Sequence, residues 1–402
     1  MSILEELKEP AVWEAFLQYK IERKHLSPKE VEIWQGFIEE RAYEPVTEHL
    51  MEAGYMFDYP TKICVNKSGT RKKRVVYSFS ETESMVLKAM GYLLYCYDEK
   101  ISSRCYSFRR NITAKDAVLD VLRIHRLTDK YCLKVDISNY FNSIPTESLI
   151  EVLEGCITED APLLDFLKRL LRVGRAYEKG NLIQEERGAM AGIPIAPFFA
   201  NIYLLSMDEV FEKRGVDYFR YSDDILLFAD SEEELQEQEA FLRQCIEEKG
   251  LSINPDKVCV TKPGEVWEFL GFSYKQGKID LSEITKNKLK AKIKRKAHAL
   301  YRWRLKKGAD FEGTARAMLR TFNKKLYDEA EENRFTWSRW FFPVLTTDEG
   351  LKELDAYLVQ YIRYLYSGRH YKGNYRVTYD EIKALGFRSL VHEYYKGKEA
   401  QV

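Results

Sequence analysis

Residues 219–228 read FRYSDDILLF, in which two adjacent acids, Asp223 and Asp224, separate two apolar runs. The apolar runs predict two short strands over residues 218–229, with the acid pair at the turn between them. Two carboxylates at a hairpin tip lose hydration and repel one another, and a divalent cation offsets both effects. Mg²⁺ prefers carboxylate and phosphate oxygens, so the pair is a candidate metal site. A solvated turn is the alternative, because Asp is common in turns.

A second apolar strand that ends in an acid lies upstream, in LKVDISNYF at residues 133–141. Taken alone, Asp136 at the end of a strand over residues 131–137 fits a turn or helix N-cap better than a metal site. If Asp136 and Asp223 lie in one sheet, however, they can hold two cations about 3.5–4 Å apart. Such a pair supports phosphoryl transfer, with one ion at an attacking 3′-hydroxyl and the other at an incoming triphosphate.

The pattern around these acids predicts an α+β fold. Residues 131–275 run in the order strand, helix, strand pair, helix, strand, which suits an antiparallel-rich sheet with helices on one face. A further hairpin is predicted over residues 61–80, and an acidic amphipathic helix over residues 231–249. The chain has neither GxGxxG after a strand nor GxxxxGK[ST], which argues against a doubly wound nucleotide-binding fold.

Composition limits the class of protein. With 402 residues, 45% hydrophobic and 31% charged, the chain is expected to be globular and to form two or three units. The start is acidic and amphipathic, and no apolar run approaches the ~20 residues of a membrane span, so a cytoplasmic location without membrane contact is expected. Seven cysteines without a CxxC pair argue against a disulfide framework and structural zinc.

The net charge of zero hides strong segregation of charge. Acidic residues concentrate at 230–248 and basic residues at 67–74 and 286–307, so the neutral total says little about a nucleic-acid partner. A helix over 286–307 would track a phosphate backbone, with a solvated helix face as the alternative. Its candidate nucleic-acid-binding residues are Lys286, Lys290, Lys294, Arg295, Arg302 and Trp303. The tyrosines of 357–375 either stack on RNA or pack against this helix, and both interpretations stay open.

Seven motifs in order resemble those of reverse transcriptases. YSDD at 221–224 is similar to their YxDD motif, and DISNYF at 136–141 to the metal-binding motif before it. GAMAGIPIAPFFANIYL at 188–204 is similar to the loop-helix motif of group II intron and other bacterial enzymes. The other resemblances are RKKRVVY at 71–77, CYSFRRNITAKD at 105–116, GLSINPDK at 250–257 and EFLGF at 268–272. Together they cover roughly residues 60–275.

The resemblance implies a right-hand polymerase fold with fingers, an antiparallel palm and a helical thumb, preceded by a helical N-terminal extension. The implied domains are the extension at 1–60, fingers at 61–130, palm at 131–275 with part of the fingers inserted at 146–187, and a thumb with a basic, Tyr-rich RNA-binding region at 280–402. The implied partners are an RNA template, a DNA product and dNTPs, and the oligomeric state stays open.

The resemblance also assigns roles to residues. Asp136 and Asp223 would bind Mg²⁺, or Mn²⁺ in its place, with Asp224 beside them and Ile137 lending its backbone carbonyl. The implied catalytic set is Asp136, Asp223, Asp224 and Lys257, the last as general acid for pyrophosphate. Phe141 would exclude a ribose 2′-hydroxyl and so select dNTPs. The implied dNTP-binding residues are Lys72, Arg74, Phe141, Gly192 and Tyr221.

Departures from the family pattern narrow the hypothesis. Met190, Ala191 and Gly192 stand where intron enzymes read PQG, and Asn142 replaces a common acid. A retron-type VTG segment and an HNH-like nuclease are absent from the sequence. The pattern resembles the defence-associated "unknown group" reverse transcriptases, which copy a structured non-coding RNA in anti-phage defence. The alternatives are an RNA-dependent RNA polymerase, which Phe141 opposes, a catalytically weak RNA-binding scaffold, which the intact acids oppose, and a group II intron-type maturase.

Overall fold

The computed structural model describes residues 1–24, 26–66, 73–185, 188–327 and 337–399, and its internal contacts divide the chain into two units, Met1–Pro263 and Gly264–Val402. The elements described in the first unit are, in chain order, α1 (Ile3–Glu6), α2 (Pro10–Lys24), α3 (Pro28–Glu39), α4 (Glu44–Thr47), β1 (Thr61–Asn66), β2 (Lys73–Ser78), α5 (Glu81–Leu93), η1 (Leu94–Lys100), α6 (Ala114–Val121), η2 (Leu127–Asp129), β3 (Tyr131–Asp136), α7 (Tyr140–Ser143), α8 (Thr146–Cys156), α9 (Ala161–Leu171), β4 (Arg175–Glu178), β5 (Asn181–Gln184), α10 (Ala196–Tyr203), α11 (Leu205–Lys213), β6 (Asp217–Tyr221), β7 (Asp224–Ala229), α12 (Glu232–Glu248), η3 (Pro255–Lys257) and β8 (Cys259–Thr261).

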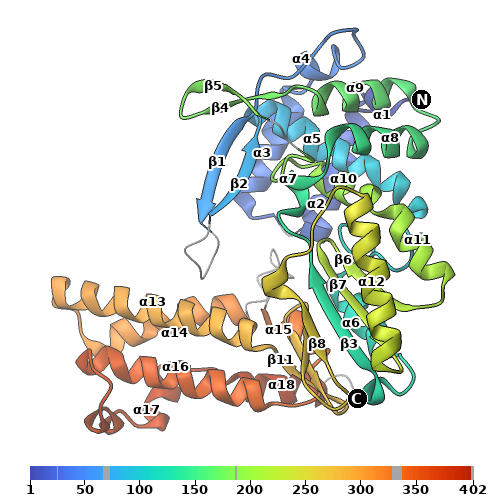
Figure 1. Ribbon diagram of the computed structural model, residues 1–402. Helices are drawn as coiled ribbons and strands as arrows, with labels where there is room; N and C mark the ends of the chain where they lie inside the picture. Colours follow the sequence, from blue (N-terminus) through green and yellow to red (C-terminus); the bar gives the residue numbers. More distant parts are fainter. Residues whose placement is uncertain (25, 67–72, 186–187, 328–336, 400–402) are drawn as a thin grey trace. The chain divides into compact units, whose positions relative to one another are not determined.

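A four-stranded antiparallel sheet, in the order β6-β7-β3-β8, forms the expected palm (Figure 1). Its inner strand β7 is buried from Ile225 to Ala229 without alternation, because both faces are covered. Helix α12, which Ser231 caps at its N-terminus, packs against β7 and β3. The predicted strands at 131–137 and 218–229 and the predicted helix at 231–249 are therefore confirmed.

A second sheet, in the order β2-β1-β4-β5, lies in the same unit. Strands β1 and β2 pair antiparallel as the predicted hairpin, and its basic turn falls outside the described residues. Strand β4 joins β1 in parallel at Thr61 and Tyr177 and continues into β5. Strands β4 and β5, which lie in the segment expected as an insertion at 146–187, thus share a sheet with β1 and β2. That arrangement requires a long-range pairing that local sequence does not encode.

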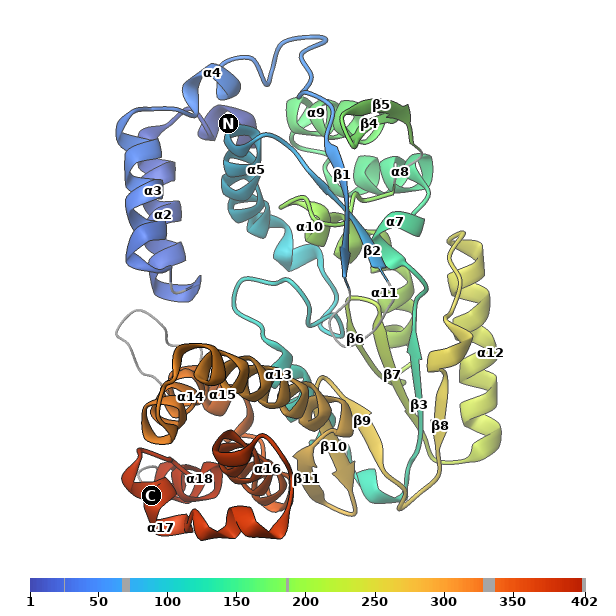
Figure 2. The same cartoon turned by 90° about the vertical axis from the view of Figure 1, so that its left-hand side faces the viewer.

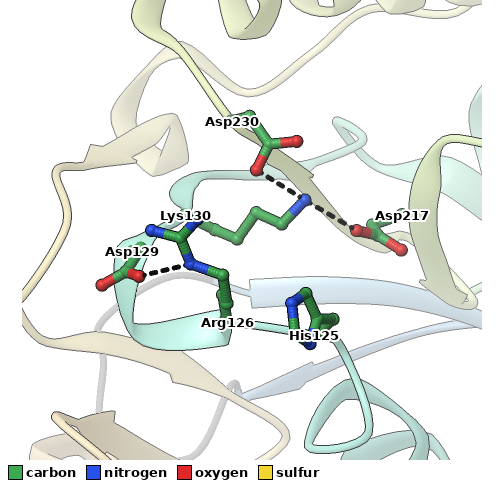
Figure 3. Close-up of a pocket in the computed structure, with 6 residues that line it drawn as sticks. All are labelled: His125, Arg126, Asp129, Lys130, Asp217 and Asp230. Atoms are coloured by element: carbon green, nitrogen blue, oxygen red, sulfur yellow. Dashed lines mark hydrogen bonds and ion pairs between the residues drawn. The ribbon is translucent and has the colours of Figure 1, made fainter.

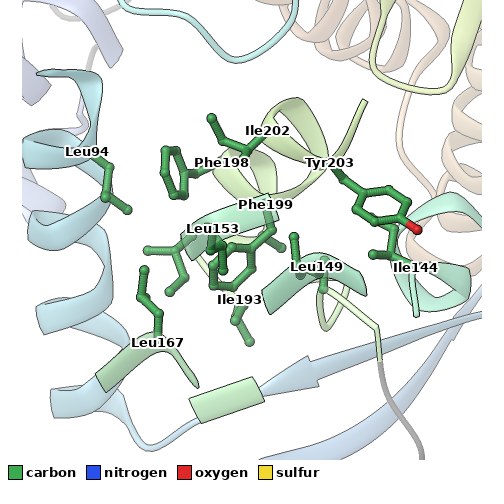
Figure 4. Packing of buried hydrophobic residues seen from close by; sticks show 14 of the residues in the cluster. Leu94, Ile144, Leu149, Leu153, Leu167, Ile193, Phe198, Phe199, Ile202 and Tyr203 are labelled. Atoms are coloured by element: carbon green, nitrogen blue, oxygen red, sulfur yellow. The ribbon is translucent and has the colours of Figure 1, made fainter. Parts of the chain in front are cut away.

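A large hydrophobic core joins these parts of the first unit. Leu149 and Leu153 of α8, Leu167 of α9, and Phe198 and Phe199 of α10 are buried together (Figure 4). Helices α2 and α3 form a pair that packs against α5, as Figure 2 shows. Met190, Ile193 and Ile195, in the loop before α10, are buried in the same core, so its packing helps to fix that loop.

The second unit contains, in chain order, β9 (Trp267–Phe269), β10 (Phe272–Lys275), β11 (Lys278–Leu281), α13 (Glu283–Lys307), α14 (Phe311–Leu326), α15 (Trp337–Phe341), α16 (Glu349–Ser367), η4 (Lys372–Arg376), α17 (Tyr379–Ala384) and α18 (Leu390–Glu399). Its three strands form one antiparallel sheet in the order β11-β10-β9. The predicted palm extends to residue 275, whereas β9 and β10 pair with β11 and not with the palm sheet.

Helix α13 is the long element of the second unit, and it packs against both α14 and α16. Ser282 caps its N-terminus by accepting from the Thr285 backbone N–H, and Gly308, with φ of 64°, ends it in the left-handed conformation. The expected α+β class is confirmed by the two units. No helix in the described part of the chain is long and apolar enough to cross a bilayer.

Candidate active site

The three acids predicted from sequence meet at one end of the palm sheet. Asp136, the last residue of β3, stands opposite Asp224 in the β3–β7 register. Tyr221 pairs with Asp224 in the β6–β7 hairpin, which leaves Ser222 and Asp223 as its two-residue turn. The Ile137 backbone N–H donates to the Asp223 carbonyl at 3.1 Å. Residues nearly ninety positions apart are thereby fixed side by side.

The environments of Asp223 and Asp224 disfavour the ionised forms of these two acids. Burial raises the pKa of Asp223, and the neighbouring Asp136 and Asp224 carboxylates raise it further. Burial also raises the pKa of Asp224, against the opposing effect of Lys134, whose Nζ lies 3.8 Å from Asp224 Oδ1. This concentration of half-buried negative charge calls for a positive partner.

Lys257 supplies one such partner. It lies in η3, and its Nζ forms an ion pair with Oδ2 of Asp136. The Asp136 side chain is almost fully buried, while the Lys257 side chain is 44% exposed. The predicted catalytic lysine is thus in direct contact with a predicted metal ligand, and its role as general acid stays a prediction.

The donor set fits a hard cation that completes its shell with substrate. Within the described ranges, no three His, Cys, Asp or Glu side chains are arranged to hold a metal ion by themselves. Mg²⁺ is commonly held by only one or two carboxylates, together with phosphate oxygens and water. Asp136 and Asp223, close enough to raise the pKa of Asp223, match that pattern.

A buried ion pair stands behind the turn that carries Asp223. Arg220 and Asp208 have side chains that are 0% exposed, and Arg220 Nε donates to Asp208 Oδ1 at 2.7 Å. The Arg220 guanidinium also donates to the Ser222 carbonyl at 3.3 Å. Tyr218 Oη donates to Asp208 Oδ1 at 2.7 Å. Sequence reasoning missed this pair, although an Arg inside an apolar strand is a signal that it has a buried partner.

Ser107 and Asn201 hold the same turn from another side. The Ser222 backbone N–H donates to Ser107 Oγ at 2.9 Å, and Ser107 Oγ donates to Asn201 Oδ1 at 2.9 Å. The Asn201 amide in turn donates to the Ser107 carbonyl at 2.6 Å. Ser222 has φ of 61°, a costly conformation for this residue type, so the turn depends on these surroundings.

The loop before α10 is fixed to β2 and α7. Asn142 Oδ1 accepts from the Ala191 backbone N–H at 2.9 Å, and its amide donates to the Val75 carbonyl at 3.2 Å. The Tyr77 backbone N–H donates to the Ala191 carbonyl at 2.8 Å. The Asn that departs from the family pattern therefore connects three segments. The close backbone approach at Gly192, with φ of 107°, is to Tyr77.

Replacing Gly192 by Ala is expected to destabilise the first unit by about 1–3 kcal/mol. A Cβ there would lie 2.9 Å from the Tyr77 carbonyl oxygen and 3.0 Å from Val76 Cβ, in addition to the strain of a positive φ. Thermal unfolding measures the effect. Gly180, with φ of 85° and nothing within 4 Å of its Cβ position, is the matched control for strain alone. If Gly192→Ala lowers the free energy of unfolding no more than Gly180→Ala does, the predicted clash with Tyr77 and Val76 is contradicted.

Residues 65–274 match the family model described as "Reverse transcriptase (RNA-dependent DNA polymerase)", and this stretch is more than half of the chain. The chain belongs to the reverse transcriptase family. The matched residues include the palm acids, Asn142 with the loop before α10 to which it bonds, and the buried pair of Arg220 and Asp208. The resemblance found in the motifs is thereby confirmed at the level of the family, and the defence-associated subgroup stays a prediction.

Relatives of this reverse transcriptase-family chain include the retron Ec86 reverse transcriptase of Escherichia coli, 25% identical over 246 residues, which cover 60% of this chain and 71% of the relative. The putative COX1/OXI3 intron 2 protein of Saccharomyces cerevisiae is 28% identical over 138 residues, which cover 34% of this chain and 16% of the relative. Apo telomerase from Candida tropicalis, truncated from the C-terminal domain, aligns with a TM-score of 0.43 and 12% identity, over 63% of this chain and 60% of that one.

The predicted nucleotide-binding residues of this reverse transcriptase-family chain fall into two groups. Phe141 in α7 and Tyr221 in β6 both lie near Phe108, with ring centroids 6.1 and 6.4 Å from it. Arg74 is exposed on β2, and Lys72 lies outside the described residues. The structure thus brings Phe141 and Tyr221 to the acid site, and contact with a nucleotide stays a prediction for these four residues and for Gly192.

The six predicted nucleic-acid-binding residues of α13 divide by face. Lys286 and Lys290 have side chains only 13% and 20% exposed, and both form ion pairs with Glu353 of α16. Lys294, Arg295, Arg302 and Trp303 are exposed. The first two therefore contribute to packing within the second unit, and the other four present charge and an indole ring to solvent. Sequence could not separate them, because charge surrounds this helix.

A polar hollow lies where β6 begins and β7 ends, at the opposite end of the palm sheet from the acids, and Figure 3 shows the side chains that line it. It has a volume of about 480 Å³ and is lined by His125, Arg126, Asp129, Lys130, Asp217 and Asp230. Lys130 Nζ lies 2.9 Å from Asp230 Oδ1 and 3.5 Å from Asp217 Oδ2, and Arg126 pairs with Asp129 at 2.9 Å. Three carboxylates face two cations in this lining, and both cations are already paired within it, so neither is left to bind an anionic ligand.

Proposed function

We propose that this protein is an RNA-directed DNA polymerase that adds dNMPs to a primer by phosphoryl transfer with two Mg²⁺ ions. The observation that carries the proposal is the meeting of Asp136, Asp223 and Asp224 at one end of the palm sheet, where burial and mutual repulsion raise the pKa of Asp223. Family membership supports the same reaction class. Positioning and charge neutralisation are the main requirements of such a transfer.

The chain's own groups have distinct roles in this proposal. Asp136 and Asp223 would hold Mg²⁺, which when bound supplies Lewis-acid activation of the 3′-hydroxyl and neutralises phosphate charge. Asp224, held near Lys134, would act mainly through its charge. Lys257, whose Nζ forms an ion pair with Asp136, would donate a proton to the leaving pyrophosphate. Arg220, Ser107 and Asn201 would keep Asp223 in place.

Phe141 is proposed to select deoxynucleotides. It lies in α7, five residues after Asp136, and its backbone carbonyl accepts from the Ala189 N–H at 2.7 Å, which fixes α7 against the loop before α10. Replacing Phe141 by Ala is expected to reduce the preference for dNTPs over NTPs by about 10- to 200-fold, because a steric wall beside the sugar is removed. Primer extension on an RNA template with each nucleotide set measures kcat/KM for both. Equal discrimination in the wild type and the variant would remove Phe141 from this role.

The same assay tests the function itself. Purified protein with a primed RNA template, Mg²⁺ and dNTPs should extend the primer, and NTPs should be poor substrates. Extension with NTPs in preference to dNTPs would instead identify an RNA-dependent RNA polymerase. Binding of RNA without extension of any primer would identify a scaffold.

The proposed template is a structured non-coding RNA, and the proposed role is defence against phage. The motif resemblance to the defence-associated reverse transcriptases supports both, and the exposed Lys294, Arg295, Arg302 and Trp303 offer cations and an aromatic ring to an RNA. Protein purified with its bound RNA should, on addition of Mg²⁺ and dNTPs, make DNA complementary to one segment of that RNA. Sequencing of both nucleic acids decides this, and a product unrelated to the co-purified RNA would contradict it.

A further inference from the structure

Residues 104–110 form a strap along the palm hairpin. The Arg220 backbone N–H donates to the Arg104 carbonyl, and the Tyr106 N–H donates to the Arg220 carbonyl, both at 2.9 Å. Cys105 forms a parallel bridge with Arg220. The strap therefore adds to the edge of β6, directly beside the turn that carries Asp223. Its path past the site is fixed by backbone pairing.

Phe108 is a strained residue in this strap. Its φ of 55° lies in the left-handed region, which a bulky L-residue rarely adopts. Its neighbours hold it there: Ser107 is fully buried, and the Arg109 guanidinium donates to the Ser102 carbonyl at 3.1 Å and the Asp98 carbonyl at 3.0 Å. Such strain persists only where the surroundings enforce it, and it is concentrated at functional sites.

Burial does not explain the strain, because the Phe108 side chain is 38% exposed. Its ring stands edge-on to Phe141, with centroids 6.1 Å apart and planes at 71°, and tilted to Tyr221, with centroids 6.4 Å apart. Edge-to-face pairs of this kind are favourable and orient the rings. The three rings come from three segments: the strap, α7 after Asp136, and β6 before Asp223.

We infer that Phe108 is a specificity-determining residue, which supports the edge of Phe141 and closes the sugar side of the nucleotide site. This inference rests on the proposed function and deepens it. Without the ring at 108, Phe141 loses the contact that orients it, and a ribose 2′-hydroxyl gains room. The strained backbone is needed because the strap must pair with β6 and still direct the ring toward Phe141.

The test is primer extension on RNA with dNTPs and with NTPs, in the wild type and in Phe108→Ala. The expected result is a fall of about 10- to 200-fold in the dNTP preference, mainly through a lower KM for NTPs, with kcat for dNTPs changed much less. Tyr395→Ala, which removes an aromatic ring 49% exposed on α18, is the control and should keep the preference. Unchanged preference in Phe108→Ala, with a clear loss in Phe141→Ala, would overturn the inference.

Two further variants keep the result interpretable. Phe108→Gly also removes the ring but accepts the positive φ, so it should lose the same discrimination while melting at a higher temperature than Phe108→Ala. If Phe108→Ala fails to fold, the dNTP preference of Phe108→Gly tests the inference in its place.

The double variant Phe108→Ala/Phe141→Ala should prefer dNTPs over NTPs as strongly as Phe141→Ala does, because both rings form one gate. Additive losses of this preference would overturn the inference. A wild type that extends no primer would instead show that the proposed function, and the inference with it, fails.

Discussion

Replacing Asp223 by Asn is expected to lower dNTP incorporation by about a thousand-fold or more, which corresponds to roughly 4 kcal/mol of transition-state stabilisation. An amide of the same shape keeps the turn but removes the charge that would hold Mg²⁺ beside Asp136. Single-turnover primer extension at saturating Mg²⁺ measures the loss. RNA binding should be unchanged, because the substitution leaves the second unit and its exposed cations untouched.

The same variant should be more stable than the wild type in the absence of metal at neutral pH. Burial and the neighbouring acids raise the pKa of Asp223, so the folded state binds more protons than the unfolded state between the two pKa values. Wild-type stability therefore falls as pH rises through that window, and this loss is absent in the Asn variant. The two melting temperatures should converge at pH values below the pKa that Asp223 has in the unfolded chain.

An Asp223→Asn variant that extends primers at the wild-type rate would exclude Asp223 from the active site.

Replacing Arg220 by Met is expected to cost about 3–5 kcal/mol, because it leaves the fully buried Asp208 carboxylate without its ionic partner. For a unit of this size that is roughly 2–4 °C of melting temperature per kcal/mol. The variant should also lose activity at temperatures where it is still folded, since the Ser222 carbonyl loses its donor next to Asp223. Thermal unfolding and primer extension at low temperature measure the two effects separately.

The surface pair of Arg123 and Asp120, with side chains 79% and 35% exposed, is the matched control. Arg123→Met should cost at most about 1 kcal/mol, because water already solvates both charges. The double variant Arg220→Met/Asp208→Leu should recover much of the stability lost in Arg220→Met, since neither buried charge is left alone. It should not recover activity. An equal loss of unfolding free energy in Arg220→Met and Arg123→Met would contradict a structural role for the buried pair.

The chemistry of the site was accessible from sequence because the chain supplies it in short local patterns. An apolar run that ends in an acid predicted both β3 with Asp136 and the β6–β7 turn with Asp223, and the register confirms both strands. Strand period and turn composition are properties of a few neighbouring residues, so no tertiary information was needed. The order of the seven motifs that resemble those of reverse transcriptases then indicated the family, which the match over residues 65–274 confirms.

Which lysines of α13 are exposed could not be predicted from the sequence. Lys286 and Lys290 have the same composition and spacing as the exposed lysines of that helix, yet both pair with Glu353 of α16. Which face of a highly charged helix is covered depends on a partner about sixty residues away in the chain. Strands β9 and β10 were predicted to belong to the palm, whereas they pair with each other and with the following β11 in a sheet of the second unit.

The sequence by itself determined strands β3, β6 and β7, the acids that they carry and the reaction class that those acids indicate, because each depends on neighbouring residues. Only the tertiary structure decided what holds Asp223 in place and what surrounds the expected sugar gate. The Ser107–Ser222 hydrogen bond joins residues 115 positions apart, and the ring of Phe108 reaches Phe141 only because the strap pairs with β6. Such contacts arise from packing of distant segments, and no periodicity or turn composition encodes them.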